Sequence, residues 1–151
     1  MPESPLALYF GFFNEVGIIS QLSTALLESR LPKGMLVSHF SVLNHLIRVE
    51  DGRTPLALAR AFQVPKTTMS HTLAVLERRG LVDLRPNPKD ARSKLVWLTG
   101  AGRQFRDDAI AALAPDMAAL AVQFDAADIA ELTTKLQEVR VFLDRRRDEP
   151  D

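Results

Sequence analysis

The chain has 151 residues, 46% of them hydrophobic and 25% charged, which is typical of a single folded domain and excludes a disordered chain. Because it has no cysteine, disulfides, cysteine-ligated zinc, iron–sulfur clusters and thiol-based sensing are excluded, and we expect no cofactor. The formal net charge of zero excludes a uniformly basic or acidic protein, but it combines segments of opposite charge.

The first predicted helix spans Leu6–Leu27. Apolar residues recur in it at helical spacing, at Phe12, Val16, Ile19, Leu22 and Leu26. Polar residues interrupt its apolar runs and no basic segment precedes them, so we predict no signal peptide, no membrane span and a cytoplasmic location. Proline and glycine in Leu31–Gly34 end this helix, and a second helix is predicted over Met35–Val49.

Two short helices and a hairpin are predicted next. Thr54 and Pro55 favour the start of a third helix that ends at Phe62, because threonine caps free N–H groups and proline fits the first turn. The fourth helix is predicted over Pro65–Arg79, with Gly80 as its C-terminal cap. Two β-type runs follow, 81–85 and 94–98, separated by a turn-rich segment, which predicts a β-hairpin.

The last third of the chain is predicted to be helical. A helix begins at about Ala101, and Pro115 is expected to kink or divide it. The final helix, predicted over Asp125–Arg146, has an apolar seam suited to packing on another helix, formed by Ile129, Leu132, Leu136, Val139 and Leu143. The fold class is therefore mainly α with a small β-hairpin wing: a winged helix-turn-helix with dimerisation helices at both ends.

We interpret residues 1–151 as one domain. About 1–34 and 101–151 are assigned to dimerisation helices, and about 35–100 to a winged helix-turn-helix lobe. The apolar seams of the terminal helices predict a homodimer, because a monomer of this size leaves them exposed.

Charge and element order together point to DNA. Residues 60–103 contain 9 basic and 3 acidic residues, a net charge of +6 between flanks of −1 and −5. In a helix-turn-helix the second helix enters the major groove of duplex DNA, and a following basic hairpin reaches the backbone or minor groove. The predicted contacts from the fourth helix are Lys66, Thr67, Thr68, Ser70 and His71. The alternatives are a solvated basic face with threonine and serine as caps, and a winged module that binds protein instead of DNA.

Five segments, 54–59, 64–70, 76–82, 88–93 and 98–102, are similar in order to the multiple-antibiotic-resistance regulator, or MarR, family of winged-helix proteins. The most specific parts of the resemblance are the leucine–acid–basic–basic–glycine–leucine–valine turn at 76–82 and the aspartate-x-arginine hairpin tip at 90–92. The chain departs from many members at His71, where they have an arginine, so a bidentate contact with guanine is lost there.

The resemblance implies a dimer whose first and last helices interlock, and a regulator, usually a repressor, that small and often aromatic ligands release from DNA. It implies that Arg92 reaches into the minor groove and that Asp90 orients the hairpin tip, which agrees with the negative potential of narrow minor grooves. Lys89 and Lys94 are further predicted DNA contacts. Two-fold symmetry predicts a pseudo-palindromic operator.

Other candidate sites are weaker. Phe13, His39 and Phe40 are candidates for a pocket that binds an aromatic or organic-acid effector. His39 and His45 lie about 240° apart around their helix, so they do not form the same-face zinc pair that i, i+4 spacing gives, and we predict no metal site. Trp97 is interpreted as a buried anchor of the hairpin. No catalytic motif stands out, so we predict that the protein is not an enzyme.

Overall fold

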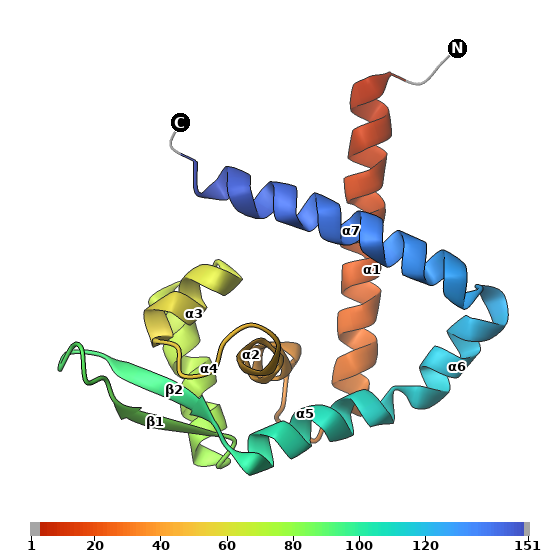
Figure 1. Cartoon of the computed structure of the whole chain (residues 1–151). Coiled ribbons are helices and arrows are strands. Elements are labelled where there is room, and N and C mark those ends of the chain that lie inside the picture. Colours follow the sequence, from red (N-terminus) through yellow and green to blue (C-terminus); the bar gives the residue numbers. More distant parts are fainter. Residues whose placement is uncertain (1–3, 150–151) are drawn as a thin grey trace. The chain divides into compact units, whose positions relative to one another are not determined.

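The computed structural model describes residues 4–149. Within this range it has seven helices and one two-stranded antiparallel sheet (Figure 1). In chain order the elements are α1 (Pro5–Arg30), α2 (Val37–Arg48), α3 (Pro55–Phe62), α4 (Lys66–Arg78), β1 (Val82–Pro86), β2 (Lys94–Leu98), α5 (Gly100–Ala112), α6 (Ala114–Gln123) and α7 (Ala126–Arg147). The predicted fold class, mainly helical with a hairpin wing, is confirmed.

The chain divides into two compact units, and the boundary along the sequence lies between Ala112 and Leu113. The first contains α1 to α5 and the hairpin, and the second contains α6 and α7. The helical segment after the hairpin is divided at Leu113, two residues before Pro115, as the proline predicted. The assignment of both chain ends to dimerisation within one domain stays a prediction.

Side-chain and glycine caps set the ends of the short helices. The Thr54 hydroxyl accepts the Ala57 N–H at 3.1 Å and begins α3. Gly80, with φ +71°, follows the end of α4; its N–H donates to the Glu77 carbonyl and the next N–H, of Leu81, donates to the Leu76 carbonyl, each at 2.9 Å. This is the Schellman pattern, which a glycine at positive φ favours. Both caps were predicted and both are confirmed.

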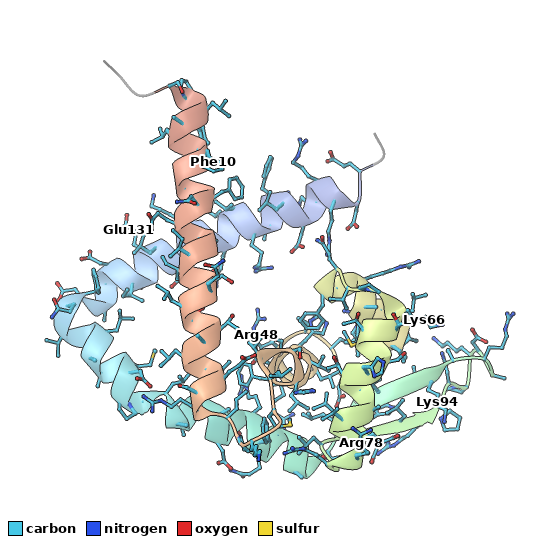
Figure 2. All side chains as sticks on the ribbon, turned by 180° about the vertical axis from the view of Figure 1, so that it is seen from behind. Phe10, Arg48, Lys66, Arg78, Lys94 and Glu131 are labelled. Carbon is cyan, nitrogen blue, oxygen red and sulfur yellow. The ribbon has the colours of Figure 1, made fainter. Side chains whose placement is uncertain are left out.

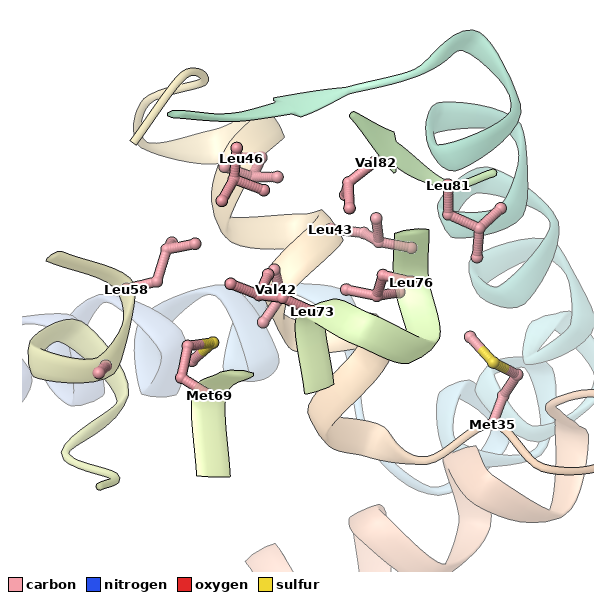
Figure 3. Close-up of a cluster of buried hydrophobic side chains, with 12 residues drawn as sticks. Met35, Val42, Leu43, Leu46, Leu58, Met69, Leu73, Leu76, Leu81 and Val82 are labelled. Atoms are coloured by element: carbon pink, nitrogen blue, oxygen red, sulfur yellow. The ribbon is translucent and has the colours of Figure 1, made fainter. Parts of the chain in front are cut away.

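The core of the first unit joins α2, α3, α4 and the hairpin. Figure 3 shows Leu43 of α2, Leu58 of α3, Leu76 of α4 and Val82 of β1 in one buried cluster, and the three leucines have no exposed surface. Close packing of this kind leaves little room for adjustment, so α4 is held firmly against the hairpin.

A third short segment pairs with the middle of β2, on the edge that faces away from β1. β1 and β2 pair from Val82 with Leu98 to Pro86 with Lys94, and Arg53 pairs with Val96 on the other edge of β2. The Trp97 ring packs on Gly52, whose φ is +68° and where a Cβ would lie 2.5 Å from the ring. Trp97 is half-buried, not buried as predicted. The turn at Gly52 covers part of its ring, and the exposed Arg85 side chain lies over the ring with Cζ 5.7 Å from the centroid.

Two helices leave apolar surface uncovered in the single chain. None of residues 5–30 of α1 is buried, and Leu6 is 80% exposed. The apolar residues of this helix are not confined to one face, since Leu8, Tyr9, Phe10 and Phe12 are all exposed. In the second unit, Leu132, Leu136 and Leu143 of the predicted α7 seam are exposed as well. Among the described residues, no helix has the length and apolarity to cross a membrane.

Candidate nucleic-acid interface

A groove lies between the first turns of α3 and α4 and the hairpin. Its volume is about 650 Å³. It is lined by Thr54, Pro55, Leu56, Lys66, Ser70, Leu84, Asn87, Asp90, Arg92, Ser93 and Lys94. We call it the α4–wing groove. Four residues predicted to contact DNA line it, Lys66 and Ser70 from α4 and Arg92 and Lys94 from the hairpin, together with Asp90, which is predicted to orient the hairpin tip.

The side chains of α4 divide into an inner and an outer set. Met69, Leu73 and Leu76 are buried in the core, whereas the five predicted DNA contacts of this helix are exposed. Figure 2 shows Lys66 at the N-terminal end of α4 and Lys94 on the hairpin. The N-cap position of α4 is occupied by Pro65, so no serine or threonine of its first turns sits at the capping position. The exposed face is therefore polar and remains open to a partner.

The hairpin tip is ordered by its own side chains. The Asp90 carboxylate accepts the Arg92 N–H at 3.0 Å, and the same oxygen lies 3.6 Å from Arg92 Nε. Asn87 accepts the Lys89 N–H at 3.0 Å and donates to the Ser93 hydroxyl at 2.9 Å. These bonds fix the backbone while the Arg92 side chain stays 95% exposed. The tip thus presents a cation from a preorganised turn.

Sequence reasoning missed several groove residues. The sequence predicts only a helix start at Thr54, and Asn87 falls in the turn-rich segment between the two predicted strands, yet both residues line the groove beside the cations. Their residue types gave the signal for local structure, but only the tertiary fold brings them to this surface.

The two histidines of α2 have structural bonds. His39 is 5% exposed, and its Nδ1 accepts the Leu36 N–H at 2.8 Å, which caps the start of α2. Burial, reinforced by Arg79, lowers the pKa of His39 against an opposing effect of Glu28. Burial followed by Arg53 and Arg48 lowers the pKa of His45, and Arg53 Nη1 lies 2.9 Å from its Nε2. Both rings are therefore neutral at pH 7.

One chain does not bring the three candidate pocket residues together. His39 is buried, Phe40 is half-buried and Phe13 is 50% exposed. Glu28 of α1 bonds the Val37 N–H at 2.9 Å, close to His39, but Phe13 lies about 22 Å back along the helix axis at 1.5 Å per residue. The single chain therefore places Phe13 apart from the other two candidates. Within residues 4–149, no cluster of three or more potential metal ligands occurs.

Comparison with known proteins agrees with this geometry. The family model that matches the chain is that of the MarR family, over residues 33–93, the segment that contains α2 to α4 and the hairpin tip. The transcriptional regulator HosA from Escherichia coli O111:H- is 31% identical over 105 residues, which cover 70% of this chain and 76% of HosA. The chain belongs to the MarR family.

Solved structures of several transcriptional regulators, some of them MarR-family members, have the same fold as this chain. The transcriptional regulator BldR from Sulfolobus solfataricus has a TM-score of 0.77 at 23% identity, covering 92% of this chain and 99% of BldR. A MarR mutant from Escherichia coli, solved in complex with operator DNA, has a TM-score of 0.69 at 25% identity, covering 91% of this chain and 99% of that chain. The winged-helix lobe is thus the part of the chain that both the family model and the solved structures match.

Proposed function

We propose that this MarR-family regulator is a homodimer that binds double-stranded DNA at a pseudo-palindromic operator, represses transcription there and responds to a small ligand. The observation that carries the proposal is the α4–wing groove, in which Lys66 of the second helix-turn-helix helix faces the same concavity as Arg92 and Lys94 of the hairpin. Along a duplex, grooves alternate with phosphate backbone. A concave surface that presents cations from both a helix and a hairpin can therefore contact a groove and the neighbouring backbone at the same time.

Each part of the surface has a different task in this proposal. The first turns of α4, with Lys66, Thr67, Thr68, Ser70 and His71, enter the major groove, which is about 12 Å wide, and read base edges. Lys89 and Lys94 neutralise phosphates, which supply affinity without sequence information. Arg92 enters the minor groove, and Asp90 holds the backbone that presents it.

The homodimer is supported by the apolar surfaces that the single chain leaves open. Exposed apolar residues on several faces of α1 are typical of a helix that is covered by other helices. A two-fold dimer places its two recognition helices about 34–36 Å apart, one turn of DNA, and so reads two symmetric half-sites.

The effector is proposed to be an aromatic or organic acid that binds near His39 and Phe40 of one copy and Phe13 of the other. This part rests on the resemblance and on the separation of Phe13 from His39 in one chain. A screen of aromatic acids that shifts neither the melting temperature nor the affinity for operator DNA rejects it.

The proposed function is tested by analytical ultracentrifugation of the full chain with and without a duplex. We expect a dimer at micromolar concentration, and two protomers per bound duplex with an affinity that falls steeply with salt. A monomer contradicts the dimer. Duplex binding that is absent at low salt contradicts the DNA-binding function and favours the alternative, a winged-helix module that binds another protein.

A further inference from the structure

The loop between α1 and α2, residues 31–36, contacts the C-terminal end of α4. The Arg79 guanidinium, just after α4, donates from Nη2 to the Lys33 carbonyl at 2.9 Å, across 46 positions of the chain. The loop makes room for this contact at Gly34, whose φ is +83° and where a Cβ would lie 2.8 Å from the same Nη2. The next residue, Met35, is 3% exposed and belongs to the core. The loop is therefore anchored on both sides of Gly34.

The same loop is fixed to α1 and to α2. The Glu28 carboxylate of α1 accepts the Val37 N–H at 2.9 Å, and His39 accepts the Leu36 N–H at 2.8 Å. Burial and the charge of Arg79 lower the pKa of His39 while Glu28 opposes them, so both side chains lie near enough to this ring to act on its charge. A continuous set of contacts thus connects the C-terminal end of α4 with α1.

This connection lies at the end of α4 that faces away from the groove. Figure 2 shows Lys66 and Arg78 at opposite ends of the helix. Its 13 residues separate these ends by about 20 Å at 1.5 Å per residue. Because α4 shares one core with α2, α3 and the hairpin, a change at the Arg79 contact tilts this whole lobe relative to α1 and moves the N-terminal end of α4 sideways. Arg79 is well placed to control the direction of α4 without reaching the bases.

We propose that Arg79 is a positioning residue that fixes the tilt of α4 relative to α1, and thereby sets the half-site spacing that the dimer selects. The inference rests on the proposed function, because α1 is the helix assigned to the dimer interface. The Gly34 conformation that accommodates the guanidinium is part of the same device.

The test is a spacing series of inverted-repeat duplexes, with the preferred spacer and with one base pair added or removed. One base pair moves a half-site by about 3.4 Å along the axis. We expect Arg79→Ala to reduce the affinity ratio between preferred and altered spacers by about three- to tenfold, the effect of one ordinary hydrogen bond, because this bond is exposed to solvent. Arg79→Lys, which keeps the charge and a donor, is expected to recover part of the ratio.

Arg78→Ala is the matched control. It removes the same charge from the adjacent, exposed position and is expected to keep the wild-type ratio. Binding is measured at a temperature at which circular dichroism shows every variant to be folded. A wild-type ratio in Arg79→Ala, or an equal loss in Arg78→Ala, overturns the inference alone. A wild-type protein that binds no inverted repeat overturns the proposed function as well, so the two failures are distinguishable.

Discussion

Replacing Gly102 with alanine is expected to lower the free energy of unfolding by about 3 kcal/mol or more, because an added Cβ meets backbone that cannot withdraw. Gly102 lies in the first turn of α5, and a Cβ there would overlap the Leu81 carbonyl oxygen and lie 3.0 Å from Leu98 Cδ1. Thr99 holds both sides of this contact: its hydroxyl donates to the Gly80 carbonyl at 2.7 Å and accepts the Gly102 N–H at 2.9 Å. The backbone at the junction of α4, the hairpin and α5 therefore cannot move aside to make room for an added methyl group.

The control for this prediction is Gly100→Ala, two residues earlier. A Cβ at Gly100 meets no atom within 4 Å, so the change in unfolding free energy is expected to stay within about 0.5 kcal/mol. Urea unfolding followed by circular dichroism measures both variants. Equal midpoints for Gly102→Ala and Gly100→Ala would show that the junction adapts, contrary to this account.

The largest expected effect on DNA binding comes from Arg92→Ala. If each Arg92 of the dimer lies in a minor groove, its removal is expected to weaken operator binding by about 1–3 kcal/mol per lobe. The slope of log affinity against log salt flattens by about 0.9 for each phosphate charge no longer neutralised. Fold and dimer are expected to survive, because the side chain is 95% exposed.

Two further variants separate the causes of this loss. Asp90→Ala is expected to give a milder form of it, since it removes the acceptor that holds the Arg92 backbone but leaves the cation in place. Arg78→Ala, at the other end of α4, removes an equal charge and is expected to change the slope less. Affinities for one operator and one scrambled duplex across a salt series measure all three. A folded, dimeric Arg92→Ala protein with wild-type affinity and slope on both duplexes would falsify the role given to the wing.

Local residue chemistry made much of the fold predictable. Thr54 with Pro55, Gly80 and Pro115 act on their own backbone, through capping, positive φ and loss of an N–H, and each marks an element boundary that the structure has. The positions of the exposed polar side chains on α4 follow from the helical period, because Met69, Leu73 and Leu76 turn to the core.

Contacts that depend on the tertiary fold were not predictable from the same signals. The bond between Arg79 and Lys33 spans 46 positions, and nothing local in either residue indicates it. The bond from the Leu36 N–H to His39 depends on how the loop enters α2, which the helical pattern of α2 does not indicate. The half-burial of Trp97 depends on the turn at Gly52, which the hairpin sequence does not contain. Tertiary packing decides these features.

Selection of bound sequences from random DNA by the purified protein is the most direct test of whether α4 and the hairpin of a symmetric dimer read duplex DNA. We expect enrichment of an inverted repeat whose half-site centres lie about 10–10.5 base pairs, or a multiple of that distance, apart. A selection that enriches no sequence, or that enriches a single asymmetric half-site bound at full affinity, contradicts this expectation.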